Sequence, residues 1–83
     1  MKLYRSRRIV RAEQFNPDRR PWPPFVEACG RDPDDPYSTG YRCAATGGYE
    51  PIGPGEWVVV DHSGRIGVRS DALFRLSYKE VKR

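Results

Sequence analysis

The sequence predicts an α+β fold, with a small antiparallel sheet of four to five strands and one or two short helices. Two observations favour this class. Short runs rich in β-branched and aromatic residues alternate with clusters of Gly, Pro, Asn and Asp, which is the usual pattern of strands and turns. The segments with helical features are only a few residues long. With 83 residues, the chain is expected to form one domain, 1–83.

The first expected strand covers roughly residues 8–15 and ends at the turn residues 16–18. Strand alternation places Tyr4, Val10 and Ala12 on one face. The other face collects charged side chains, namely Arg5, Arg7, Arg11 and Glu13. This stretch therefore predicts a strand with one apolar face and one face that is mostly charged.

The middle of the chain predicts a helix followed by a loop. Pro24 is suited to the first position of a helix and Gly30 to its C-terminal cap. Residues 25–29 are therefore expected to form a short helix that packs on the sheet. Residues 30–40 are rich in Pro and Asp, and this composition predicts a loop.

The second half of the chain predicts several short strands joined by tight turns. The expected strands are residues 41–45, 49–52, 56–61 and 65–69. The third is the clearest, since its four consecutive apolar residues imply burial on both faces. A hairpin turn that ends at Gly64 joins it to the fourth strand, in which Ile66 and Val68 are expected to face inward.

The C-terminal part predicts a second short helix at residues 71–74. Ser70 is a candidate N-cap for it, and Asp71 complements the helix dipole. Leu76 and Tyr78 alternate afterwards, which predicts a last strand or an extended tail.

Charge is distributed unevenly along the chain, within a formal net charge of +4. Residues 1–20 carry seven Lys or Arg and two acidic residues, and residues 65–83 carry six Lys or Arg and two acidic residues. Residues 21–64 carry two Arg and seven acidic residues. Basic ends favour anionic partners, and contact between basic ends and an acidic middle would give a homo-oligomer.

The sequence also predicts where the protein resides. No apolar run approaches the ~20 residues that span a bilayer, so no membrane partner is expected. The basic start has no apolar stretch behind it and does not predict a signal peptide. Cys29 and Cys43 do not make a disulfide framework. A cytoplasmic protein with reduced thiols is therefore expected.

No catalytic or metal-binding motif is recognisable. The single histidine, His62, lies between Asp61 and Ser63, and three adjacent turn residues cannot adopt the nucleophile, base and orienting-acid order of a triad. The two cysteines and His62 lack a fourth metal ligand. The acidic residues of the 30–40 loop lack the spacing of a calcium loop. We therefore expect a protein that is not an enzyme and needs no cofactor or metal.

Arginine residues form the strongest candidate binding site. Arginine outnumbers lysine by twelve to three, and its planar guanidinium group suits phosphate and carboxylate. If the first strand and the 65–69 strand share a sheet face, five side chains converge, namely Arg5, Arg7, Arg11, Arg65 and Arg69. Aromatic residues offer stacking surfaces from loops, namely Trp22, Tyr37, Tyr41 and Tyr49. The alternative is a solvated basic face in an arginine-rich sequence.

Residues 53–57 combine a tight turn with the start of a strand, because Pro54 presets φ and Gly55 permits a positive φ. Together with the basic opening at 4–15 and with residues 70–74, this run resembles the PGDYG proteins, a family of small phage and prophage proteins named after a Pro-Gly-Asp-aromatic motif. Here Glu replaces the Asp of that motif. The resemblance covers about half of the chain. It implies a fold and a phage or prophage origin, which would place the protein in the cytoplasm of a bacterial host, without implying an activity.

Two functions are expected from these features. The first is a phage-type binding protein that captures a phosphate-bearing ligand, either a nucleotide or a nucleic acid, through the arginine cluster and Trp22. A role in host takeover or anti-defence rests on the resemblance alone. The alternative is a protein that inhibits a host protein through Trp22 and the acidic loop.

Overall fold

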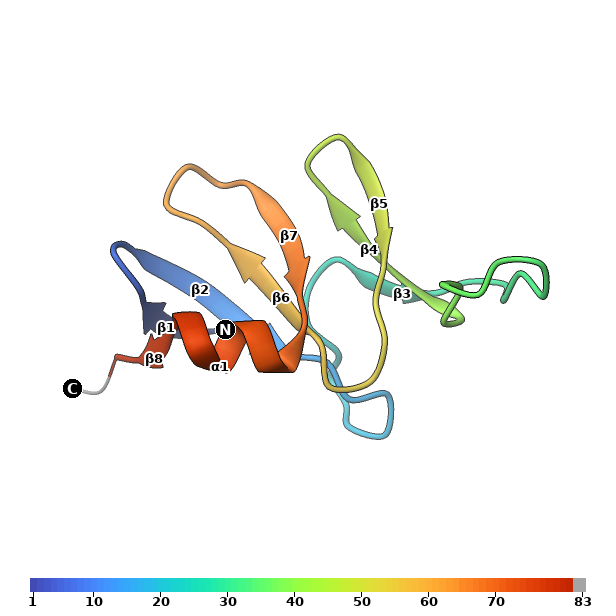
Figure 1. The fold of residues 1–83 in the computed structure, drawn as a ribbon, viewed down its shortest axis with the longest axis horizontal. Helices are drawn as coiled ribbons and strands as arrows, with labels where there is room; N and C mark the ends of the chain where they lie inside the picture. The colour runs from blue at the N-terminus through green and yellow to red at the C-terminus, as the bar shows by residue number, and fades with distance from the viewer. Residues whose placement is uncertain (82–83) are drawn as a thin grey trace.

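The structure, a computed structural model, describes residues 1–81, so the last two residues of the expected basic end, 82–83, lie outside the described residues. The described chain folds into two antiparallel sheets and one short helix (Figure 1). In chain order the elements are β1 (Lys2–Arg5), β2 (Ile9–Gln14), β3 (Val26–Ala28), β4 (Tyr41–Ala45), β5 (Gly48–Pro51), β6 (Trp57–Val60), β7 (Ile66–Arg69), α1 (Asp71–Ser77) and β8 (Lys79–Glu80).

The strands are divided between a five-stranded sheet of order β7-β6-β2-β1-β8 and a three-stranded sheet of order β3-β4-β5. The α+β class is confirmed in this coarse form. The expected single sheet of four to five strands is wrong, because the middle of the chain forms a second sheet of its own. The larger sheet combines the two basic ends of the sequence.

Strand β6 is the centre of the core and is buried on both faces, as its apolar run predicts. Trp57 and Val59 contribute to one hydrophobic cluster, which lies beneath α1. Val58 contributes to a second cluster, together with Cys43 and Ile52 from the region of the smaller sheet. We call the face with Trp57 and Val59 the helix-side face of the large sheet, and the face with Val58 the sheet-side face.

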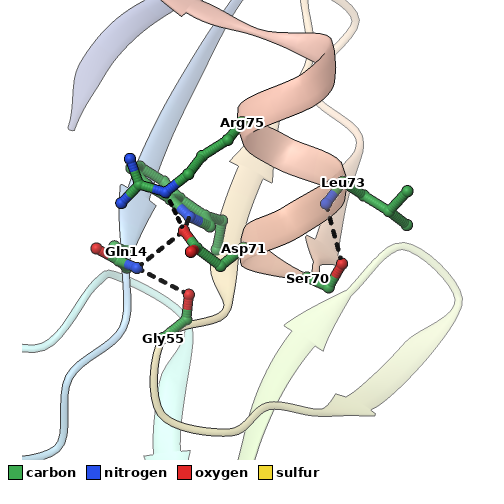
Figure 2. Close-up of polar contacts among 7 residues, drawn as sticks. Gln14, Gly55, Ser70, Asp71, Leu73 and Arg75 are labelled. Atoms are coloured by element: carbon green, nitrogen blue, oxygen red, sulfur yellow. Dashed lines mark hydrogen bonds and ion pairs between the residues drawn. The ribbon is translucent and has the colours of Figure 1, made fainter.

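The helix α1 is fixed at its start by hydrogen bonds. The Ser70 hydroxyl accepts a hydrogen bond from the Leu73 backbone N–H, which confirms the expected N-cap. One Asp71 carboxylate oxygen accepts hydrogen bonds from Trp57 Nε1 at 2.9 Å and from Gln14 Nε2 at 3.2 Å (Figure 2). These bonds join the first turn of the helix to β2 and β6.

One buried aromatic ring holds the rest of α1 against the sheet. Phe74 stacks on Trp57, with ring centroids 3.9 Å apart and an interplanar angle of 9°. The helix continues to Ser77, so Leu76 lies on its outer side and is 84% exposed. The alternating strand expected through Leu76 and Tyr78 is therefore wrong, and only the two-residue strand β8 follows the helix.

The helix expected at residues 25–29 is also wrong, since this segment forms β3. Phe25 has a φ of +77°, a left-handed conformation that interrupts a helix at its first turn. Val26 then pairs with Cys43 of β4, and Glu27 forms an ion pair with Arg42 at 2.6 Å. A helix of five residues has little stability of its own, so pairing with β4 determines the conformation.

The smaller sheet also closes one edge of the larger sheet. Strand β7 lies at that edge, where its outward N–H groups have no strand partner. The Ile66 N–H donates to Thr46 Oγ1 at 3.0 Å, and the Val68 N–H donates to Glu50 Oε2 at 3.2 Å. Side chains from the β4–β5 hairpin thus replace the missing strand.

Candidate functional site

Two hairpin tips meet at one end of the large sheet. Strands β2 and β6 are antiparallel, and Arg11 pairs with Val60, so the start of β2 lies beside the end of β6. The β1–β2 tip at residues 6–8 and the β6–β7 tip at residues 61–65 therefore lie at the same end (Figure 1). Arg8 Nη1 and His62 Nε2 are 3.1 Å apart and join the two tips by a hydrogen bond.

A groove with two lobes lies on the helix-side face beside these tips. The tip lobe, of about 290 Å³, contains Arg7, Arg8 and His62. The strand lobe, of about 370 Å³, contains Arg65 and Arg69. Asp61 and Tyr78 line both lobes, so the two lobes are adjacent. We call this feature the arginine groove and define it by Arg7, Arg8, Arg65, Arg69, Asp61 and Tyr78.

The groove is open because α1 is too short to cover the whole helix-side face. Seven residues of α-helix extend only ~10 Å. Tyr78 follows the last helical residue, and its backbone N–H donates to the Phe74 carbonyl at 2.9 Å. Its ring stacks on Phe74 with centroids 4.9 Å apart. Tyr78 thus separates the part of the face that α1 covers from the open part.

The four arginine side chains of the groove carry uncompensated charge. Within residues 1–81, none of them lies within ion-pair distance of a carboxylate. The Arg8 guanidinium group forms a hydrogen bond with the His62 ring, and that of Arg69 donates to the Val68 carbonyl next to it in the chain. The charges of these guanidinium groups are therefore available to an external anion.

Two carboxylates also line the groove, but both are engaged by the protein. Asp61 Oδ1 accepts hydrogen bonds from the Ser63 hydroxyl at 2.7 Å and from the backbone N–H groups of Ser63 and Arg65. These bonds, above all the one from the Ser63 side chain, lower the pKa of Asp61. Glu50 accepts from the Val68 N–H. Within residues 1–81 these carboxylates thus accept hydrogen bonds from the protein and form no ion pair with the groove arginines.

A glycine shapes the floor of the strand lobe. Gly67 lies on β7 between Arg69 and Arg65, the residue just before the strand, and alternation directs both arginine side chains to the helix-side face. A Cβ atom at position 67 would lie 3.0 Å from Arg69 Nη1. Glycine therefore lets the Arg69 guanidinium group lie close to the strand.

The structure brings together three of the five arginines that the sequence singled out, namely Arg7, Arg65 and Arg69. Arg5 and Arg11 do not join them. Arg11 lies between the buried helix-side residues Val10 and Ala12, so its side chain belongs to the sheet-side face, and Arg5 follows the same alternation after Tyr4. The expected convergence of five arginines is corrected to three.

Trp22 lies away from the arginine groove. Its ring packs edge-on against Phe15 and Tyr41, and its Nε1 donates to the Pro17 carbonyl at 3.2 Å. The Arg20 guanidinium group covers the ring at 4.0 Å from its centroid. Trp22 is thus half-buried at the margin of the second hydrophobic cluster.

The other expected stacking residues are also distributed outside the groove. Tyr41 packs in the second cluster, and Arg42 lies over the Tyr49 ring at 4.2 Å from its centroid. Tyr37 is 78% exposed, on the 30–40 loop at the opposite end of the molecule (Figure 1).

Sequence reasoning missed two groove residues, Arg8 and Tyr78. Arg8 was placed at the start of a strand, whereas it lies in the tip of a hairpin. The signal for that hairpin was the polar run at residues 5–8 between two apolar segments. The signal for Tyr78 was its position four residues after Phe74. In a helix, residues four apart lie on the same face, so this spacing indicates that the two rings are neighbours.

No helix formed by the described residues is both long and apolar enough to cross a membrane. In the same part of the chain, His, Cys, Asp and Glu do not gather in groups of three or more that could hold a metal ion. A scan against models of protein families finds no match, and searches of curated proteins and of solved structures find none either. The resemblance to the PGDYG proteins therefore stays a prediction.

Proposed function

We propose that this protein binds a phosphate-bearing ligand in the arginine groove and acts by binding rather than by catalysis. The observation that carries the proposal is a set of four guanidinium groups that line the two adjacent lobes and have no carboxylate partner within residues 1–81. They come from two hairpins, and the contact between Arg8 and His62 holds the hairpin tips together.

Phosphate is the ligand group that this groove suits best. A guanidinium group donates two parallel hydrogen bonds to phosphate oxygens, and such charge-assisted bonds are about twice as strong as neutral ones. The groove carries four such groups and only two carboxylates, which already accept hydrogen bonds from the protein. An incoming anion therefore meets net positive charge.

The polar contacts near the groove also support binding rather than catalysis. The Ser63 hydroxyl donates to Asp61, whereas the His62 ring faces Arg8. No hydrogen bond between Ser63 and His62 activates the hydroxyl as a nucleophile. A role of this binding protein in host takeover or anti-defence rests on the resemblance alone and is part of the proposal.

The proposal is tested with the double variant Arg7→Ala/Arg65→Ala, which removes one guanidinium group from each lobe. The matched control is Arg19→Ala/Arg31→Ala, which removes the same charge from exposed positions outside the groove. Binding of a fluorescein-labelled oligonucleotide and of a fluorescent ATP analogue is measured by anisotropy in low salt. We expect the groove variant to lose about tenfold or more in affinity for the ligand that binds.

Two results would contradict the proposal. Equal losses in the groove variant and in the control would show that net charge alone attracts the ligand. Failure of the wild-type protein to bind either phosphate ligand in low salt would remove the basis of the proposal.

A further inference from the structure

We infer that the ligand of the arginine groove is a single strand of nucleic acid, which places phosphates in both lobes and a base against Tyr78. This inference rests on the proposed function and names the class of phosphate ligand. Three observations carry it, namely the spacing of the two hairpins, the position of Asp61 and the position of Tyr78.

The spacing of the two hairpins that carry the arginines favours a ligand with spaced phosphates. The β1–β2 and β6–β7 hairpins are neighbours in the sheet order, so their midlines lie two strand spacings, ~10 Å, apart. Neighbouring phosphates of a triphosphate share an oxygen atom and lie much closer together than this. In a polynucleotide each phosphate is separated from the next by a sugar, so one strand reaches both lobes.

Asp61 disfavours a compact polyanion across the centre of the groove. It lines both lobes, and the hydrogen bonds from Ser63 favour its ionised form. A phosphate at this central position would be repelled by the carboxylate. A polynucleotide can instead place a sugar or a base there, with its phosphates on either side.

Tyr78 provides the aromatic surface at the same central position. Its ring lines both lobes while it stacks on Phe74, which fixes its orientation. An unpaired base can stack on such a ring, whatever its identity. The bases of a duplex are already stacked on each other, so the aromatic surface favours a single strand.

The experiment compares four probes by anisotropy or by competition. They are a labelled twelve-nucleotide thymidine strand, the same strand in a duplex with its complement, ATP and inorganic triphosphate. We expect the single strand to bind at least about tenfold more tightly than each of the other three. Titrations at several salt concentrations then count the phosphates in contact, since each contributes ~0.7 to the slope of log affinity against log salt for single strands.

Two lobe variants locate those phosphates. Arg7→Ala/Arg8→Ala and Arg65→Ala/Arg69→Ala each remove one arginine pair, and each is expected to lower the salt slope by about 1.4. Arg19→Ala/Arg31→Ala is the control and should leave the slope unchanged.

Tyr78→Leu should weaken single-strand binding about fivefold or more, whereas Tyr78→Phe should retain it. Circular dichroism verifies that each variant is folded.

The outcomes separate this inference from the proposed function. If ATP or triphosphate binds as tightly as the strand and still depends on the groove arginines, the proposed function stands and the single-strand inference fails. Tighter binding of the duplex, or a slope that only one lobe variant changes, also overturns the inference. If no phosphate probe depends on these arginines, both fail.

Discussion

Asp71 joins the only helix of the described chain to the sheet through one carboxylate. It accepts hydrogen bonds from Trp57, Gln14 and Arg75, all on the same oxygen (Figure 2). The hydrogen bond from Trp57, followed by the one from Arg75, lowers the pKa of Asp71 below its ordinary value of 3.8. Protonation of Asp71 is therefore less favourable in the folded state than in the unfolded state.

This pKa difference predicts an acid-dependent contribution to stability. Because the pKa of Asp71 is lower in the folded state, its contribution is complete above the ordinary value of 3.8 and is lost as the pH falls through the folded-state pKa. Urea unfolding between pH 2 and pH 6 should show a smaller acid-induced loss of stability in Asp71→Asn than in the wild type. Asp18→Asn, at an exposed carboxylate, is the control. Identical pH profiles for Asp71→Asn and the wild type would contradict this account.

The two cysteines are predicted to differ in reactivity. Cys43 is buried in the second cluster, and burial, with a smaller effect of Glu50, raises its pKa to about 11. Cys29 is half-buried near the surface. Because the thiolate is the reactive form, a chromogenic disulfide reagent at pH 8 should titrate one thiol rapidly in the native protein and two in denaturant. Rapid reaction of both thiols in the native state would show that Cys43 is accessible.

At the scale of elements, the closed edge of β7 links the smaller sheet to the arginine groove. Glu50 accepts from the Val68 N–H, and Val68 precedes Arg69. Glu50→Ala removes the acceptor, so amide exchange at Val68, followed by NMR, should accelerate about fivefold or more. Glu50→Gln keeps an acceptor oxygen and should exchange more slowly than Glu50→Ala. Equal exchange rates in the wild type and both variants would show that this hydrogen bond does not protect the edge.

Local chemistry predicts some of these elements well. Pro54 and Gly55 form the expected turn, in which Gly55 has a φ of +86° and the Glu56 N–H donates to the Gly53 carbonyl. The Ser70 cap and the doubly buried strand β6 are likewise determined by residues that are neighbours in the sequence.

Elements that depend on distant partners could not be predicted in this way. The helical signals of residues 25–29 are overridden because β4 offers them a strand partner. The same limit applies to the candidate site. Alternation along one strand relates Arg65 to Arg69, but only the pairing of β2 with β6 brings Arg7 and Arg8 beside them.

At the scale of the whole molecule, opposite charges lie at opposite ends. The described chain measures 43 × 27 × 22 Å, with the β1–β2 and β6–β7 hairpin tips toward one end of the long axis and the acidic 30–40 loop at the other (Figure 1). Two acidic side chains of the loop accept hydrogen bonds from the loop's own backbone, Asp32 from the Asp34 N–H and Asp35 from the Tyr37 N–H. The loop is therefore expected to be separate from the binding surface.

This separation predicts that the acidic loop has little influence on binding. At physiological salt, charges farther apart than a Debye length of ~8 Å are largely screened. The triple variant Asp32→Asn/Asp34→Asn/Asp35→Asn should change the affinity for a single-stranded oligonucleotide by less than about twofold. A larger gain in affinity, together with a change in subunit number by sedimentation, would indicate that the loop of one copy competes for the groove of another.

The most direct test of the account is an NMR titration of the ¹⁵N-labelled protein with a short thymidine strand. Binding in the arginine groove should concentrate the amide shifts at residues 6–8, at residues 61–69 and at Tyr78, which together surround the groove. Shifts concentrated in the 30–40 loop or around Trp22, with the two hairpin tips unchanged, would contradict it.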